Sequence, residues 1–229
     1  MNTLTQYFDA RAEVYNVLSV PFYKELTNDI CARLSIVLPV IRDIANFYND
    51  EKCLNEVLRL EKCLEGDLDE NKMAGEFARL FLGVNKASHT GHTITPHESV
   101  YTSASRLVMQ KAWEEVYKVY CEQKLGKHSS FKEPEDHITA EMSFMVYMSR
   151  KCGEYAEQDR FDELQQNIGE QVSFLSYHLC SWVNLLDDDI SKSDSSDFYK
   201  SLSKVLVHFL SLDKKSLKDM KEDLVEIAV

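Results

Sequence analysis

Glycine and proline are scarce in this sequence: only 7 of its 229 residues are glycine and only 4 are proline. These two residues dominate the tight turns that connect short strands, so their scarcity argues against a many-turned β protein and favours long helices. The sequence also lacks an apolar run of transmembrane length, which predicts no stable insertion into a membrane. A secretory leader is not expected either, because residues 3–15 are polar and amphipathic.

The six cysteines include no CxxC pair, and most of them fall in apolar helical patterns. They are Cys31, Cys53, Cys63, Cys121, Cys152 and Cys180. Without a paired spacing or a leader, this usage indicates a reducing cytosol, in which the thiols serve as small buried hydrophobic side chains. A structural zinc site built on these cysteines is not expected.

Positive charge is in short supply, with 26 Lys and Arg against 38 Asp and Glu and a formal net charge of −12. This balance disfavours nucleic acid and anionic membrane surfaces as partners, and it is compatible with a basic peptide partner. The patterns GxxxxGK and GxGxxG, which hold nucleotide phosphates, do not occur in the sequence, nor does the GxSxG turn of serine hydrolases. The motifs therefore predict no cofactor.

Nearly every segment has the apolar periodicity of an α-helix, which predicts an all-α protein, an irregular bundle of about ten helices. Irregular stretches are expected at 84–96, 126–132 and 187–196. The chain is predicted to form one domain, 1–229, with an N-terminal subdomain 1–126, a hinge 127–133 and a C-terminal subdomain 134–229. Helices are expected over 3–19, 68–82, 103–125, Pro134 to about Cys152, about 159–186 and 198–212. Further helices are expected to begin at Pro21 and at Pro39, after a cap at Asn49-Asp50, and after a cap at Asp213.

The stretch 131–145 combines a proline, four acids and a histidine at the start of a predicted core helix. Pro134 suits the first helical position, and Asp136 in the first turn would favour the positive end of the helix dipole. His137 and Glu141 are four residues apart and would share a helix face. The cluster predicts a well-capped helix, a binding site, or a metal-dependent enzyme that uses Asp136, His137 and Glu141.

An aromatic-rich stripe is predicted on the helix over 68–82, where Phe77, Leu80 and Phe81 recur at helical spacing. Such a stripe usually belongs to the core. Next to a polar loop it could instead form a groove for an apolar peptide segment, and spacing alone does not separate the two interpretations.

Five segments occur in an order that resembles the TorD/DmsD/NarJ family of chaperones for molybdenum enzymes, also called redox enzyme maturation proteins. Residues 76–83 resemble the family's helix before its central loop, and residues 96–101, Pro-His-Glu-Ser-Val-Tyr, resemble its P-x-E-S-V-Y motif. Residues 133–138, Glu-Pro-Glu-Asp-His-Ile, are very close to its E-P-x-D-H signature. The C-terminal segments 178–182 and 198–202 fit in residue type and order.

The resemblance implies a cytoplasmic, all-helical chaperone that is not an enzyme. Family members bind the twin-arginine signal peptide, and often the apoprotein, of a molybdenum-cofactor oxidoreductase; they assist cofactor insertion and delay export until the enzyme is folded (Tat proofreading). Some form domain-swapped homodimers by opening before E-P-x-D-H, so monomer and swapped dimer both remain open here. Weak guanine nucleotide binding is carried over from some members. A sibling chaperone that activates a non-exported metalloenzyme remains an alternative.

The resemblance also implies a peptide-binding site on residues that match the family motifs. Carboxylates such as Glu98, Asp136 and Glu141 can pair with the guanidinium groups of the leader, and an apolar groove would hold the segment that follows them. His97 departs from the aromatic residue that DmsD-like members often carry, and 187–189, three aspartates, match no family signature. The full predicted site comprises Phe77, Leu80, Phe81, Pro96, Glu98, Ser99, Tyr101, Pro134, Asp136, His137 and Glu141.

Overall fold

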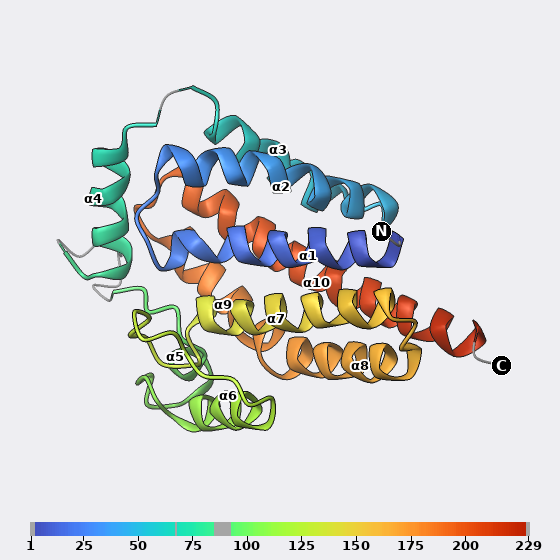
Figure 1. The fold of residues 1–229 in the computed structure, drawn as a ribbon. Helices are drawn as coiled ribbons and strands as arrows, with labels where there is room; N and C mark the ends of the chain where they lie inside the picture. The colour runs from blue at the N-terminus through green and yellow to red at the C-terminus, as the bar shows by residue number, and fades with distance from the viewer. Residues whose placement is uncertain (1–2, 67, 85–92, 228–229) are drawn as a thin grey trace.

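The protein is all-α in its computed structural model, which describes residues 3–66, 68–84 and 93–227 (Figure 1). No strand occurs in these described ranges, and the predicted all-α bundle is confirmed. The eight residues 85–92, in the middle of the stretch expected to be irregular, lie outside the described residues. The helices are α1 (Thr3–Ser19), α2 (Asn28–Phe47), α3 (Glu51–Cys63), α4 (Glu70–Phe81), α5 (Glu98–Thr102), α6 (Lys111–Glu122), α7 (Ile138–Glu157), α8 (Phe161–Tyr177), α9 (Leu179–Lys192) and α10 (Asp197–Ile227), with a 3₁₀ turn at Val20–Phe22.

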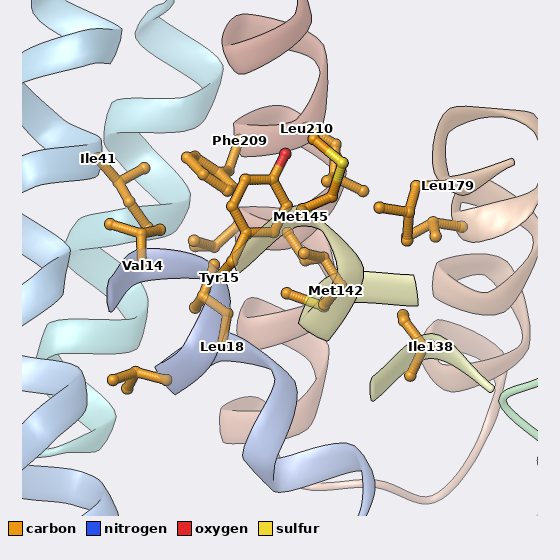
Figure 2. Close-up of a cluster of buried hydrophobic side chains, with 14 of the residues drawn as sticks. Val14, Tyr15, Leu18, Ile41, Ile138, Met142, Met145, Leu179, Phe209 and Leu210 are labelled. Atoms are coloured by element: carbon orange, nitrogen blue, oxygen red, sulfur yellow. The ribbon is translucent and has the colours of Figure 1, made fainter. Parts of the chain in front are cut away.

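The core is built around α1, which packs on α7 and α2, while α10 packs on α3, α8 and α9 (Figure 1). Figure 2 shows side chains from these helices meeting in one cluster, with Tyr15 of α1, Met145 of α7 and Phe209 of α10 at its centre. The rings of Tyr15 and Phe209 meet edge to face at 5.0 Å. In the sequence, α1 precedes the predicted hinge 127–133 and α7 follows it, so helices from both predicted subdomains share this core. The division into subdomains and hinge stays a prediction.

A buried ion pair ties α1 to α10. Arg11 donates two hydrogen bonds to the Asp213 carboxylate, from Nε at 2.6 Å and from Nη2 at 2.8 Å, and both side chains are almost fully buried. Tyr15 Oη donates to the same carboxylate at 2.6 Å, and Arg11 Nη1 donates to Gln171 of α8 at 2.6 Å. Burial alone would lower the pKa of Arg11, but the charge of Asp213, the charge of Tyr15 and the hydrogen bond to Asp213 together raise that pKa above its ordinary value. The network therefore fixes three helices in register.

Several predicted helix boundaries are wrong for reasons that involve tertiary contacts. Asp213 does not cap a last helix, because it lies inside α10 as the partner of Arg11. Pro39 lies inside α2, where the buried residues on either side, such as Leu38 and Ile41, keep one continuous apolar face against the core. Pro21 begins only a 3₁₀ turn, and α2 begins after Thr27, whose side chain accepts from Ile30 N.

Three further expectations are corrected in the second half of the chain. The helix predicted over 159–186 is broken at His178, whose backbone leaves the helical region between α8 and α9. The acidic residues 187–189 belong to α9 and not to a loop. The helix predicted over 103–125 is α6 alone, since 103–110 forms a turn after α5.

Other boundaries agree with the sequence. Asp50 caps α3 by accepting from Cys53 N at 3.0 Å, as expected. Gly83 ends α4 with a φ of 73°, and a Cβ there would lie 2.7 Å from Thr93 Oγ1, so the close approach of the two chain segments requires glycine. Of the cysteines, Cys31, Cys53 and Cys152 are buried as predicted, whereas Cys121 is exposed. None of the helices within the described ranges has both the length and the apolar character to cross a membrane.

The Arg11–Asp213 pair gives the first testable prediction. Asp213→Ala should lower the free energy of unfolding by about 3–5 kcal/mol, because it leaves the Arg11 guanidinium buried without its counter-charge. Urea denaturation followed by far-UV circular dichroism measures the loss. The matched control is Glu13→Ala, which breaks the half-exposed pair with Arg33 (N–O distance 2.9 Å) and should cost less than about 1 kcal/mol. Equal losses in the two variants would contradict the assignment.

Candidate functional site

Two motif segments that are far apart in the sequence meet in a short antiparallel contact. His97 and His137 form an isolated bridge, in which Glu98 N donates to Asp136 O at 2.8 Å and Ile138 N donates to Pro96 O at 2.9 Å. The P-x-E-S-V-Y and E-P-x-D-H motifs are therefore parts of one structural unit. We call the contact between residues 96–98 and 136–138 the motif ladder.

Asp136 holds the motif ladder to the start of α5. Its carboxylate is fully buried, and Oδ2 accepts from Ser99 N at 3.0 Å, while Oδ1 has no hydrogen-bond partner. The hydroxyl of Ser99 in turn accepts from Gln110 N at 3.0 Å, which fixes the turn between α5 and α6. A carboxylate at the first turn of a helix is favourable because it receives free backbone N–H groups. Asp136 thus orders both α5 and the turn after it.

Two buried glutamates extend the cluster toward α9. Glu98 Oε2 lies 2.9 Å from His178 Nδ1, and Glu141 Oε2 accepts from Trp182 Nε1 at 3.2 Å. Burial, and then the charge of Glu98, raise the pKa of Glu141 well above its ordinary value. The interior therefore favours the protonated form of the Glu141 carboxyl. Trp182 also stacks on Tyr101 with ring centroids 5.5 Å apart, which joins the last residue of the P-x-E-S-V-Y motif to the same network.

Both histidines of the motif ladder are buried and held neutral. His137 is the N-cap of α7, since its Nδ1 accepts from Thr139 N at 3.1 Å, so α7 begins at Ile138 and not at Pro134 as predicted. Burial, and then the neighbouring His97, lower the pKa of His137 well below its ordinary value. Burial also lowers the pKa of His97, against the opposing charges of Asp136 and Glu133. His97 Nε2 lies 3.3 Å from Glu133 Oε2 but makes no hydrogen bond to it.

The aromatic stripe of α4 is joined to the motif ladder through the backbone. Ile94 N donates to Leu80 O at 3.0 Å, which brings the chain from α4 toward the segment that contains Pro96. Phe77 and Leu80 are buried, and the half-buried Phe81 packs edge to face on Phe22 and Tyr199 at 6.1 and 5.6 Å. The structure brings Pro96, Glu98, Ser99, Tyr101, Pro134, Asp136, His137 and Glu141 into one connected cluster, with Phe77, Leu80 and Phe81 on α4 beside it.

Sequence reasoning did not assign the residues that pin the segment before α7. Glu135 accepts from Trp113 Nε1 of α6 at 2.7 Å and pairs with Lys127 Nζ at 3.3 Å. The segment also borders an apolar hollow of about 340 Å³, which includes Phe131 and Tyr147. No local pattern in the sequence indicates these contacts, because Trp113 looks like any other apolar position of a helix.

The alternative of a metal centre at Asp136, His137 and Glu141 finds no ligand set. Within residues 3–66, 68–84 and 93–227, no group of three His, Cys, Asp or Glu side chains could hold a metal ion. The Glu141 carboxyl is instead turned to Trp182, and the His137 Nδ1 lone pair is used by the backbone of α7.

Comparison with known proteins gives one family and a consistent group of relatives. Residues 49–187 match the model of the nitrate reductase delta subunit family. The chain is 26% identical over 220 residues to the chaperone protein TorD of Aliivibrio fischeri, covering 95% of this chain and 99% of that protein. It is 26% identical over 222 residues to the TorD of Aliivibrio salmonicida and 24% identical over 220 residues to that of Vibrio cholerae, covering 95% and 94% of this chain.

The raised pKa of Glu141 predicts a pH dependence of stability. The unfolded chain ionises this group near its ordinary pKa of 4.5, whereas the folded protein keeps the proton to higher pH, so the unfolded state binds fewer protons in between. The contribution of Glu141 to stability is therefore complete below pH 4.5 and is lost as pH rises toward the folded pKa. In Glu141→Gln, which cannot ionise, this loss should be absent.

Urea denaturation of parent and Glu141→Gln between about pH 4.5 and pH 8 tests this prediction. The free energy of unfolding of the variant minus that of the parent should rise with pH. Glu115→Gln on the exposed face of α6 is the control, and its difference from the parent should change far less. A pH-independent difference for Glu141→Gln would show that the buried carboxyl is ionised throughout.

Proposed function

The chain belongs to the nitrate reductase delta subunit family of TorD- and NarJ-type proteins, and from this premise we propose that it binds the twin-arginine signal peptide and the apo form of a molybdenum-cofactor oxidoreductase. It is a molybdoenzyme maturation chaperone and not an enzyme, in keeping with relatives that are named chaperones. In this proposal the protein works in the cytoplasm, assists cofactor insertion and delays export of its client until the client is folded.

The observation that carries the proposal is the motif ladder. Two motifs that the resemblance associates with leader binding, separated by more than thirty residues in the sequence, are hydrogen-bonded into one unit at the start of α7. A shared rigid element is what a recognition site needs, because it holds several chain segments in fixed positions relative to one another.

The predicted site residues divide into two roles under this proposal. Glu98, Asp136 and Glu141 are buried and engaged with protein partners, so they act as positioning residues that give the surface above them its shape. Tyr101 and Pro134, which are only partly buried, lie where a peptide can touch them. The remaining residues, Phe77, Leu80, Phe81, Pro96, Ser99 and His137, support the apolar side of the site.

Two properties of the family enter the proposal as open alternatives. The protein is monomeric or forms a domain-swapped homodimer by opening at 127–133, where Lys127 and Glu135 now close the segment onto α6. Guanine nucleotide binding is retained only as a weak interaction, since the sequence contains no glycine-rich phosphate cradle.

Leader binding tests the proposed function. Leader peptides from the twin-arginine-exported molybdoenzymes encoded in the same genome are titrated into the protein by calorimetry. At least one should bind, with an affinity that falls as salt is raised, because guanidinium groups meet carboxylates. Asp136→Ala should weaken that binding about tenfold or more, because the Ser99 N–H loses its acceptor and the start of α5 is no longer fixed.

The control for this variant is Asp162→Ala, which removes an exposed acid at the start of α8 and should bind the leader as the parent does. Circular dichroism confirms that both variants are folded. Capture of clients by the tagged protein, followed by mass spectrometry, identifies the enzyme that is served. If no leader binds the parent and no molybdoenzyme is captured, the proposed function is wrong.

A further inference from the structure

Two hollows lie side by side where α5 and the turn after it face α9. Their volumes are about 640 and 320 Å³, and Tyr101, Arg106 and Asp189 line both of them. We call the two hollows together the Tyr101 groove. It begins at the last residues of the P-x-E-S-V-Y motif, and so it lies on the outer side of the network that contains Glu141 and Trp182.

Asp188 and Asp189 supply the groove with carboxylates that are only loosely engaged. Arg106 Nη2 lies 3.7 Å from Asp189 Oδ2, and Lys192 Nζ lies 3.9 Å from Asp188 Oδ2. The Asp189 side chain is 38% exposed and the Asp188 side chain is 62% exposed, so these ion pairs contribute little to stability. Each aspartate can therefore exchange its present cation for another. Asp187 differs, because it accepts from Ser203 and is paired with Lys204 of α10.

The three predicted site acids, Asp136, Glu98 and Glu141, cannot pair with a ligand's cation without rearrangement. Asp136 is fully buried under the Ser99 backbone, Glu98 is buried against His178, and Glu141 is buried against Trp182. A guanidinium group that reached them would have to displace protein partners and lose its water in a closed interior. Unlike these three acids, Asp188 and Asp189 can be reached by solvent and by a ligand.

Arg106 already shows how the groove holds a guanidinium group. It has a φ of 53° and projects beside Asp189 from the turn after α5, with its side chain 65% exposed. Burial, and then the charge of Asp189 and a hydrogen bond to it, raise the pKa of Tyr101, so this hydroxyl stays protonated and steadies the carboxylate. The chain's own arginine thus occupies the place that a ligand's arginine would take.

An apolar strip adjoins the charged part of the groove. Leu107, Val108 and Met109 follow Arg106 directly and are 61%, 41% and 52% exposed, and the exposed Leu185 of α9 lines the smaller hollow. Three consecutive exposed apolar residues are uncommon on a protein that works alone, and they mark a contact surface. The combination of acids with an adjoining apolar strip matches a peptide in which arginines precede an apolar run.

We propose that the Tyr101 groove receives the arginine-bearing part of the client's leader peptide. Asp188 and Asp189 pair with the leader's guanidinium groups, Arg106 is displaced from Asp189, and the strip over residues 107–109 covers the start of the leader's apolar run. This inference rests on the proposed function. It assigns the recognition charges to Asp188 and Asp189 of α9, which match no motif of the family.

Calorimetric titration of the leader into three variants tests the groove. Asp188→Asn with Asp189→Asn should bind the leader roughly tenfold more weakly and with a smaller dependence on salt, since two charge contacts are lost. Arg106→Ala should bind it about threefold more tightly, because the internal competitor is removed. The matched control, Asp159→Asn with Asp162→Asn, removes two exposed acids at the start of α8 and should bind as the parent does.

A second peptide separates the groove from a general effect of charge. With both leader arginines replaced by glutamine, the parent and the Asp188→Asn, Asp189→Asn variant should bind equally, because the contact that distinguishes them is gone. If the leader binds the parent and this double variant with the same affinity, the groove is wrong while the proposed function stands. If the leader does not bind the parent at all, the proposed function fails together with the groove.

Discussion

The motif ladder is the constraint on which the rest of the site depends. Its two backbone hydrogen bonds join segments on either side of α6, and the Asp136 carboxylate ties the same point to Ser99. Because α7 begins there and packs on α1, the ladder is anchored in the core of the bundle. The start of α5, the turn over 103–110 and the facing surface of α9 are all positioned from this one place. The candidate site therefore has a rigid base, with turns at its edge.

The fold class could be predicted from the sequence because helical periodicity is a local signal. The cap at Asp50 and the end of the helix predicted over 68–82, which Gly83 terminates, were predicted correctly for the same reason: a cap and a helix stop act within a few residues. Asp213 was assigned wrongly because its spacing suits a helix cap, whereas its partner, Arg11, is about two hundred residues away. The predictions at Pro39 and His178 were wrong in opposite ways. A helix start was predicted at Pro39, which packing keeps inside one continuous helix, whereas no break was predicted at His178, where the helix is interrupted and the side chain contacts Glu98.

The sequence indicates which motif residues group together, but not how they are arranged or buried. The order of the motifs brought Glu98, Ser99 and Asp136 into one group, and the structure joins them by hydrogen bonds. Burial could not be predicted in the same way, because it depends on which helices cover each side chain. Glu141 shows the difference. Its helical spacing from His137 suggests a charged ligand, but in the structure it is buried, its pKa is raised and it accepts a hydrogen bond from Trp182 of α9. The partners Trp113 and His178 have no local signature that links them to the site.

The carboxylates of this protein are separated into two populations by their environment, and the separation bears on how a basic peptide can be recognised. A buried carboxylate that already has a partner fixes shape, since removing that partner leaves an uncompensated polar group in the interior. An exposed carboxylate beside a groove can exchange cations quickly at little cost, which suits a chaperone that must release its client. Glu98, Asp136 and Glu141 belong to the first population, and Asp188 and Asp189 belong to the second. Under the proposed function, in which a leader is bound and later released, the reversible contacts are expected at the surface of α9, over a base of buried acids that are already engaged with protein partners.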